Sequence, residues 1–569
     1  MLIVVALAPL WLIGMFGRGL WTPDEPREAD IAWRMSLQQD RTLPQLAGTP
    51  FLEKPPLTYW LSGAAVALLG DSAAAARAPN LAYALLSALA VGALALGLQG
   101  QVVPALLATL VTMSALIAYR VSVWLAPDAC LFAGCALALL GAWYGYRAQP
   151  GRSKAAGYAL MHVGAAIGFM AKSAPGWLVP ALALLALILW ERRWRELTRW
   201  ELYAGFALQA LIIGPWLLAV ARGSGGGDAL RTLFWHNLIG RFTPVAAPAA
   251  LDYTSGHRNT AGKYLLELPL YLLPWTFVAA AALVRAWTRM RDSGTDATAW
   301  RFALAASVPF LVLLSVAATA RDIYAAPALL GFGALAGLWA KEAQGAPSGL
   351  DRLALRLTQV LVAALALAFA AALLVLAAAG LIAWPVGAAG AAAILALAAA
   401  PLLGAARAGR GGDVQRSLAF TYTGYAAALS VAALLVLPVI DRWQDLPSLA
   451  QRIRADTAHQ PLALLDPDET TIAMLDRGFA TRFAPLSGGA GAREAVTAWF
   501  RTHGPDARVL VLLPGHAPGA LSAWLARFRA LPAAGDGEAG SLVAAGAAAL
   551  VTRYELPQGR RYALLGPPR

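Results

Sequence analysis

The sequence has little charge and little cysteine, and each shortage excludes a class of protein. Only 14% of the 569 residues are Asp, Glu, Lys or Arg, whereas 59% are hydrophobic and the mean hydropathy is +0.59. A soluble enzyme of this length would not need so many apolar residues. Cys130 and Cys135 lie five positions apart in one apolar run and do not share a helical face. They therefore indicate neither a disulfide framework nor a cysteine metal site.

Signals for nucleotides and for a cleaved leader are also missing. The glycine run from Gly223 to Gly227 lacks the strand-turn-helix setting of a phosphate loop, so we expect no nucleotide. The net charge of +13 would suggest nucleic acid in a soluble protein. Here it indicates Arg-rich cytoplasmic loops that favour anionic lipid headgroups, and no nucleic-acid partner is expected. The segment from Leu2 to Leu20 has no basic start and no small-residue cleavage site, which predicts a retained anchor.

Apolar runs are what the sequence has in abundance. About thirteen runs have the length that spans a bilayer as a helix, at 2–20, 79–98, 102–118, 128–146, 156–171, 175–190, 202–220, 264–284, 302–319, 324–340, 355–379, 386–405 and 417–440. With this number of spans, the basic connections all fall on one side, which the positive-inside rule assigns to the cytoplasm. The loops at 21–78 and 221–263 and the C-terminal tail then lie on the opposite, periplasmic side.

The tail has a different composition from the rest of the chain. The segments LALLDP at 462–467 and RVLVLLP at 508–514 are typical of short buried strands between polar helices. We therefore predict an α-helical polytopic membrane domain over residues 1–440 and a small periplasmic α/β domain over residues 441–569. The apolar stretch at 57–70 is predicted to be an interfacial helix, because a span there would reverse the side of every later loop.

Charged side chains at the periplasmic ends of the spans are the candidates for a functional site, because burying them near lipid is costly without a partner. The loop from Trp21 to Trp60 contains many of them, and six prolines restrict its backbone. The candidates are Asp24, Glu25, Glu53, Lys54, Arg77, Arg120, Asp128, Lys172, His236, Arg241, His257, Arg258 and Arg321, together with Tyr324 beside Arg321. Acids together with several cations at one surface suit a pocket that binds phosphate or pyrophosphate.

Each candidate also has a structural interpretation that stays open. Asp24 or Glu25 can be a solvated loop acid, and Glu53 with Lys54 can be a surface ion pair of little energetic consequence. A single histidine such as His236 is more often a hydrogen-bonded structural residue than a metal ligand.

Several motifs occur in the order in which a known family has them. They are WTPDEPREADIAWRM, FLEKPPLTYWL, AARAPN, IGFMAKSAPGWLVP, FWHNLIGRF and RDIYAAP. In these motifs the chain resembles the GT-C polyprenyl-phosphate-sugar glycosyltransferases. The likeness is greatest to the lipid A 4-amino-4-deoxy-L-arabinose transferase family, which is related to the protein O-mannosyltransferases. It covers residues 1–340, whereas the last spans and the tail match in layout only.

The resemblance implies roles for the candidate residues. Asp24 corresponds to a catalytic acid with Glu25 beside it, and Asp128 to a second acid. The positions that contact the donor phosphate or the substrate are Lys54, Lys172, Arg241, Tyr324, Arg27, Tyr59 and Arg321. A divalent ion, zinc or magnesium, would be bound by Glu53 with His236, and His257 is the alternative histidine.

The resemblance also implies the reaction and the partners. It predicts an inverting enzyme that moves a sugar, 4-amino-4-deoxy-L-arabinose, from undecaprenyl phosphate to a lipid A phosphate at the periplasmic face of the bacterial inner membrane. The expected partners are the undecaprenyl-phosphate-linked donor, lipid A or another periplasmic acceptor, and membrane lipids, and the chain is expected to be a monomer. Transfer to protein or to another glycan or lipid is one alternative. A lipid-linked sugar transporter or flippase is another, but the charges gather at one surface rather than at the midplane.

Overall fold

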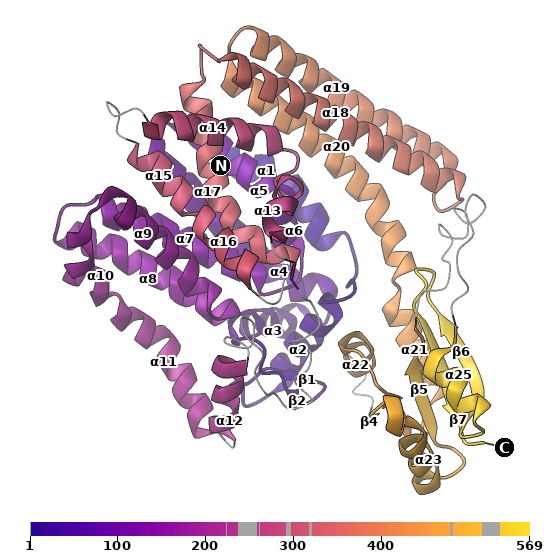
Figure 1. Cartoon of the computed structure of the whole chain (residues 1–569). Helices are drawn as coiled ribbons and strands as arrows, with labels where there is room; N and C mark the ends of the chain where they lie inside the picture. Colours follow the sequence, from indigo (N-terminus) through magenta and orange to yellow (C-terminus); the bar gives the residue numbers. More distant parts are fainter. Residues whose placement is uncertain are drawn as a thin grey trace.

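The computed structural model describes residues 2–223, 225–236, 259–260, 262–291, 297–317, 321–477, 482–514 and 535–568. Within these ranges a large bundle of helices is followed by a small domain with a mixed sheet, which α20 (Val414–Trp443) connects to the bundle (Figure 1). The predicted fold class, a polytopic helical membrane protein with a C-terminal α/β domain, is confirmed.

The helices of the membrane domain follow the apolar runs of the sequence. They are α1 (Leu2–Phe16), α4 (Ala73–Gln99), α5 (Val102–Ser114), α6 (Leu116–Val123), α7 (Asp128–Arg147), α8 (Arg152–Lys172), α9 (Pro175–Glu191), η1 (Trp194–Thr198), α10 (Trp200–Ala204), α11 (Phe206–Arg222), α12 (Gly226–Arg231), η2 (Thr232–His236), α13 (Lys263–Tyr271), α14 (Thr276–Arg291), α15 (Thr298–Ala305), α16 (Val308–Val316), η5 (Asp322–Ala328), α17 (Leu329–Glu342), α18 (Gly349–Ala378), α19 (Trp384–Arg410) and α20.

The number of membrane spans differs from the sequence-based count. Eight described helices are long and apolar enough to cross a membrane, or up to ten if each of two bent pairs is one span. The predicted count of about thirteen is not confirmed, because several apolar runs bend or stop short of span length. The helices α5 and α6 meet at 70°, and α13 and α14 meet at 116°.

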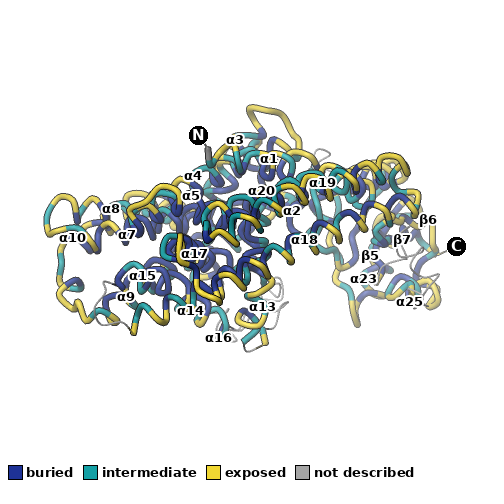
Figure 2. Tube along the Cα trace, turned by 90° about the horizontal axis from the view of Figure 1, so that it is seen from above, coloured by how far each residue is buried: buried dark blue, intermediate teal, exposed yellow. Residues whose placement is uncertain are grey.

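The core of the membrane domain lies around α7 and α17. The most apolar stretch of α7 is 89% buried inside the protein. The most apolar stretch of residues 322–342, which form η5 and α17, is 94% buried. The corresponding stretches of α18, α19 and α20 are only 33%, 28% and 28% buried. Figure 2 shows the same contrast, with exposed stretches along α18 and α19. Apolar helices that are this exposed are expected to face lipid.

The loop between α1 and α4 is a packed part of the fold. It contains α2 (Glu25–Leu37), a ribbon of β1 (Gln45–Leu46) and β2 (Thr49–Pro50), and α3 (Leu57–Leu69). Pro26 lies in the first turn of α2, where its missing N–H leaves no helical bond unmade. The charged residues Arg27, Glu28 and Asp30 of α2 are nevertheless buried. At 13 residues, α3 is shorter than a membrane span, as expected for an interfacial helix.

Glycine allows α7 and α8 to pack at close range. A Cβ atom added at Gly141 of α7 would lie 2.2 Å from the backbone nitrogen of Met161 in α8. Small residues at such an interface let membrane helices approach each other closely. The two helices run in opposite directions, so the first residue of α7, Asp128, lies beside the last residue of α8, Lys172.

The residues after α20 form the C-terminal domain. Its elements are α21 (Leu446–Asp456), β3 (Leu462–Leu465), α22 (Glu469–Asp476), β4 (Ala484–Leu486), η6 (Gly489–Gly491), α23 (Ala492–His503), β5 (Arg508–Leu512), α25 (Gly537–Ala544), β6 (Ala549–Glu555) and β7 (Arg561–Gly566). The strand order is β4-β3-β5-β7-β6, with β3 parallel to β4 and β5, and β7 antiparallel to β5 and β6. The strands predicted at 462–467 and 508–514 are β3 and β5. Apolar clusters cover both faces of the sheet, with α21 and α22 on one face and α23 and α25 on the other.

The C-terminal domain contacts the first loop through α22, which packs on α2. Arg34 Nε donates a hydrogen bond to Asp476 Oδ2 at 2.5 Å, and Arg477 Nη2 donates to Asp71 Oδ1 at 2.7 Å. Asp30 lies in the same interface, beside Asp476. Burial and the neighbouring charge of Asp476 raise the pKa of Asp30 to about 8.

This raised pKa predicts that the domain contact weakens in alkali. A carboxyl group whose pKa is higher in the folded chain than in the unfolded chain stabilises the fold most below the unfolded pKa, which is about 4. This stabilisation is lost as the pH rises through the pKa of the group in the folded chain. We expect the Tm of the wild type in detergent to fall by a few degrees more than that of Asp30→Asn between pH 5 and pH 9. The asparagine still accepts the hydrogen bond that Ala47 N donates to Asp30. Parallel curves for the two proteins would contradict this assignment.

Candidate active site

Glu25 lies between two arginines in the interior of the protein. Arg18 Nη2 donates to Glu25 Oε1 at 2.9 Å, and Arg77 donates through Nε at 3.0 Å and through Nη2 at 2.7 Å. The Leu125 backbone N–H also donates to Oε1, at 2.8 Å. The side chains of Glu25 and Arg77 have no exposed surface. Burial acts to raise the pKa of Glu25, but the two guanidinium groups outweigh it and keep the pKa below its usual value. Glu25 therefore connects α2 to the helices around it.

Asp24, the neighbour of Glu25, is held by a different pair of arginines. Arg321 makes two hydrogen bonds to its carboxylate, Nη1 to Oδ1 at 3.0 Å and Nη2 to Oδ2 at 2.5 Å. Arg27 Nη2 lies 3.3 Å from Asp24 Oδ1. Burial acts to raise the pKa of Asp24, but Arg321 and then Arg27 lower it to about 2. Asp24 is therefore a carboxylate at neutral pH and a weak base.

Glu28 and Lys54 form a second cluster with Arg27. Lys54 Nζ donates to Glu28 Oε1 at 3.0 Å, and Arg27 donates to the same oxygen from Nη2 at 2.7 Å. Glu53 lies 3.5 Å from Lys54 Nζ. Burial acts to lower the pKa of Lys54, but the negative charge of Glu28 raises it above its usual value, so the ammonium group stays charged. Tyr59 of α3 lines a small cavity together with Glu28.

Lys172 and Asp128 form a third cluster at the adjoining ends of α7 and α8. Lys172 Nζ donates to Asp128 Oδ1 at 2.5 Å and lies 4.3 Å from the centre of the Tyr324 ring. Tyr324 belongs to η5, which begins directly after Arg321. The short helix η5 therefore connects the Lys172 cluster to the Asp24 cluster, and the two belong to one charged region.

The described part of this region contains four carboxylates and four cations. The carboxylates are Asp24, Glu28, Glu53 and Asp128, and the cations are Arg27, Lys54, Lys172 and Arg321. When a phosphate enters the region, its oxygens can replace the carboxylates as partners of the cations. Phosphate and carboxylate oxygens both accept hydrogen bonds and both carry negative charge. The arrangement is suited to binding an anion that arrives and leaves.

Of the residues predicted from the sequence, the structure brings Asp24, Arg27, Glu53, Lys54, Tyr59, Asp128, Lys172, Arg321 and Tyr324 into this region. Glu25 lies in the separate cluster with Arg18 and Arg77. Arg241, His257 and the side chain of His236 lie outside the described residues. Glu28 was missed, although its spacing from Asp24 places the two on one face of a helix.

The metal site stays a prediction. Glu53 is the only one of its three candidate ligands whose side chain is described, and it is paired with Lys54. Within the described ranges, no group of three or more His, Cys, Asp or Glu side chains is placed to bind a metal ion.

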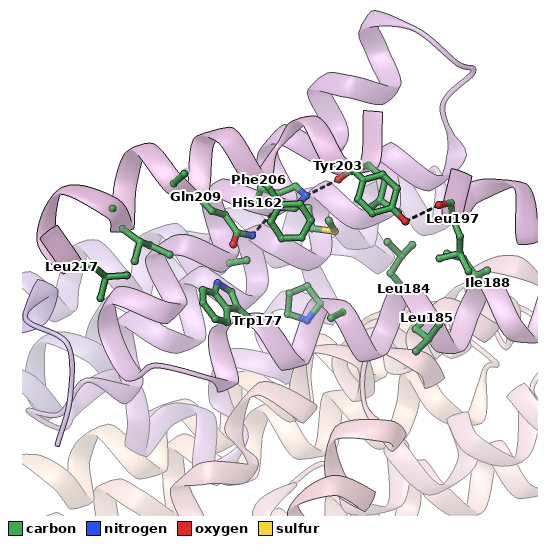
Figure 3. A pocket seen from close by; sticks show the side chains of 18 residues that line it. His162, Trp177, Leu184, Leu185, Ile188, Leu197, Tyr203, Phe206, Gln209 and Leu217 are labelled. Carbon is green, nitrogen blue, oxygen red and sulfur yellow. Dashed lines mark hydrogen bonds between the residues drawn. The ribbon is translucent and has the colours of Figure 1, made fainter. Parts of the chain in front are cut away.

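A large apolar groove lies between α8, α9, α10 and α11 (Figure 3). Its volume is about 750 Å³, and its lining includes Trp177, Leu184, Phe206 and Leu217. Trp177 follows Lys172 by five residues, so the groove reaches toward the charged region. The main polar side chains are His162 and Gln209, and they bond to each other at 2.6 Å. An apolar cavity of this size suits a long hydrocarbon chain.

Comparison with known proteins gives matches in sequence. Residues 3–224 match the family model described as dolichyl-phosphate-mannose-protein mannosyltransferase. The chain is 31% identical over 318 residues to the undecaprenyl phosphate-alpha-4-amino-4-deoxy-L-arabinose arabinosyl transferase of Edwardsiella ictaluri, which covers 56% of this chain and 55% of that protein. It is 30% identical over 292 residues to the protein of the same name from Pseudomonas aeruginosa, which covers 51% of each. The chain thus spans about half the length of the curated relatives it matches.

The match in fold extends over the whole chain. The structure is similar to the crystal structure of ArnT from Cupriavidus metallidurans bound to undecaprenyl phosphate, with a TM-score of 0.70 and 19% identity, covering 99% of this chain and 97% of that chain. The apo structure of the same protein gives a TM-score of 0.69. The sequence matches confirm the predicted resemblance to the GT-C polyprenyl-phosphate-sugar glycosyltransferases, and the structures show the shared fold. Within that class, the aminoarabinose transferases are similar to this chain in sequence and in fold.

The complete burial of Glu25 between two arginines predicts that its replacement destabilises the fold. Glu25→Gln leaves two buried guanidinium groups without their counter-charge, and we expect a loss of about 3–5 kcal/mol in the free energy of unfolding. Unfolding in detergent, followed by tryptophan fluorescence, measures this loss. Asp322→Asn, which breaks the partly exposed pair with Arg120, is the matched control and should cost less than about 1 kcal/mol. Equal losses in the two variants would show that Glu25 has no special structural role.

Proposed function

We propose that this chain is an inverting glycosyltransferase that moves 4-amino-4-deoxy-L-arabinose from undecaprenyl phosphate to a phosphate of lipid A at the periplasmic face of the bacterial inner membrane. The observation that carries the proposal is a charged region centred on Lys172, Asp24 and Arg321 beside an apolar groove. A donor with a phosphate head and a long isoprenoid tail needs both features. The curated relatives are named undecaprenyl phosphate-alpha-4-amino-4-deoxy-L-arabinose arabinosyl transferases, and the similar crystal structure contains undecaprenyl phosphate.

In the proposed reaction, an oxygen of the acceptor phosphate forms a bond to the anomeric carbon of the sugar. The bond between that carbon and the oxygen of the lipid phosphate breaks, and the electron pair leaves with the lipid phosphate. Cations placed where this negative charge develops stabilise the transition state, which is the role we assign to Lys54, Lys172 and Arg321. Attack opposite the leaving group inverts the configuration at the anomeric carbon.

The low pKa of Asp24 bears on the choice of acceptor. A carboxylate with a pKa of about 2 accepts a proton poorly from a hydroxyl group at neutral pH. A phosphate acceptor is already ionised, so Asp24 needs only to orient it through Arg27 and Arg321. These considerations favour lipid A phosphate over a protein hydroxyl. We also propose that the enzyme acts as a monomer.

The match of residues 3–224 to a protein mannosyltransferase model supports a second candidate, transfer to a hydroxyl of a protein. Reconstitution of the purified chain in liposomes with undecaprenyl-phosphate aminoarabinose distinguishes the two. Lipid A and a secreted protein are supplied as competing acceptors, and mass spectrometry identifies the product. The main proposal requires the sugar on a lipid A phosphate, and sugar on the protein instead would establish the second candidate.

The same assay tests the assigned cation. Lys172→Met removes a positive charge from the site of the leaving phosphate, and we expect the rate of transfer to fall on the order of 10²-fold. Arg553→Gln removes a cation from an exposed pair with Asp536 in the C-terminal domain and should leave the rate unchanged. Full activity of Lys172→Met would remove Lys172 from the mechanism.

The groove is tested by filling it. Gly214 lines the groove, and a Cβ atom at this position meets no other atom within 4 Å. Gly214→Phe is expected to raise KM for the undecaprenyl donor about tenfold, which corresponds to roughly two lost methylene contacts at about 0.8 kcal/mol each. The value of kcat should not change, because the groove holds the tail and not the sugar. Gly214→Ala is the control, and a donor with a short prenyl chain should be insensitive to both changes. An equal rise in KM for the short donor would show that the tail does not occupy this groove.

A further inference from the structure

Arg27 lies between the first loop and the C-terminal domain. Its Nη2 contacts Asp24 Oδ1 at 3.3 Å and Glu28 Oε1 at 2.7 Å, while its Nε donates to Glu28 Oε1 at 3.2 Å. Its remaining nitrogen, Nη1, donates to Glu469 Oε2. Glu469 is the first residue of α22, in the C-terminal domain. Each nitrogen of this guanidinium group therefore has a carboxylate partner, and one partner comes from the other domain.

The residue after Glu469 holds the backbone beside Asp24. The hydroxyl of Thr470 donates a hydrogen bond to the carbonyl oxygen of Pro23 at 3.3 Å. Because Pro23 directly precedes Asp24, α22 contacts the Asp24 region twice. One contact fixes the main chain before Asp24, and the other fixes the guanidinium group beside its carboxylate.

The start of α22 is itself fixed by the C-terminal domain. Asp468 caps the helix by accepting a hydrogen bond from the Thr471 backbone N–H at 2.9 Å. Arg560, which precedes β7, donates from Nη2 to Asp468 Oδ1 at 2.5 Å. The position of Glu469 is therefore set by the fold of the C-terminal domain.

Glu469 also affects how closely Arg27 contacts Asp24. Arg321 makes two hydrogen bonds to Asp24, whereas Arg27 makes a single long contact of 3.3 Å. Glu469 attracts the opposite edge of the Arg27 guanidinium group, away from Asp24. Without that charge, Arg27 is free to turn toward Asp24 and to compete with Arg321 for its oxygens.

We propose that Glu469 is a positioning residue for the sugar transfer, acting through Arg27 on the orientation of Asp24. Helix α22 thereby makes the C-terminal domain a part of the active site. This inference rests on the proposed function, because the sugar transfer is the reaction whose rate is measured. The positioning of Arg27 and Asp24 rests on the contacts of α22 alone. Positioning of this kind acts on the chemical step, because a small displacement of an orienting group lowers the rate more than it lowers binding.

The chain offers a matched control in the same interface. Asp71 and Arg477 form the ion pair at the other end of α22, and their side chains are 30% and 17% exposed. Asp71→Asn loosens the docking of α22 without touching Arg27. If α22 only docks the C-terminal domain, Asp71→Asn and Glu469→Gln should have similar effects on kcat. If Glu469 positions Arg27, only Glu469→Gln should lower kcat.

The experiment uses the full chain in liposomes with undecaprenyl-phosphate aminoarabinose and lipid A. We expect Glu469→Gln to lower kcat about tenfold, with KM for both substrates within about twofold of the wild type. Glu469→Asp keeps the charge and should recover part of kcat, and Asp71→Asn should keep kcat within about twofold. Wild-type turnover by Glu469→Gln, or an equal loss in Asp71→Asn, would overturn the proposal.

Hydrogen exchange measured by mass spectrometry on the same proteins separates this inference from the proposed function. Glu469→Gln should speed amide exchange at the start of α2, in residues 24–30, and Asp71→Asn should not. Unchanged exchange there in Glu469→Gln would overturn the positioning role, whatever the activity. Failure of the wild type to transfer the sugar would instead refute the proposed function, and the exchange data would still decide whether α22 holds Asp24 in place.

Discussion

The pairing of buried charges is the constraint on which the rest of the structure depends. The first loop places Glu25, Arg27 and Glu28 in the first turn of α2 and Asp24 at its N-cap, and all four side chains are buried. None of these groups tolerates burial alone, because an unpaired charge in a medium of low dielectric costs several kcal/mol. Glu25 is satisfied by Arg18, which follows α1, and by Arg77 of α4. Its neighbours are satisfied from the residue before η5, from the loop before α3, and from α22. The charges at the start of one helix thus fix the positions of five other segments.

The same pairing explains how a site for an anion can exist before the anion arrives. Each cation of the region already has a carboxylate, so the protein folds without phosphate, and the carboxylates are the groups that a phosphate replaces. The packing of α7 against α8 contributes the Asp128–Lys172 pair. Close contact through Gly141 lets the two antiparallel helices place these residues side by side at their adjoining ends. The apolar groove includes residues of the next helix, α9, so the proposed lipid-phosphate donor has adjoining polar and apolar surfaces.

Sequence alone predicts those features that a local pattern encodes. Apolar length predicted the membrane domain, and short apolar segments predicted β3 and β5, because bilayer thickness and strand burial act on consecutive residues. The number of spans was not predicted correctly, because one apolar run can form two helices: α13 and α14 meet at 116°, with Pro274 in the break between them. Motifs identified Asp24, Lys54 and Lys172 as candidates. The partners of these residues could not be read from spacing, because Asp24 and Arg321 lie 297 positions apart.

The contact between Arg27 and Glu469 has a consequence for biogenesis. The two residues are 442 positions apart, so the first is synthesised and inserted long before the second leaves the ribosome. During that interval the α2 charges lack one of their carboxylate partners, and the loop around Asp24 is not held on its outer side. The site is completed only when the last domain has folded. A chain truncated before α22 lacks the Arg27–Glu469 contact, so the arrangement of Asp24 and Arg27 found in the full protein depends on the C-terminal domain.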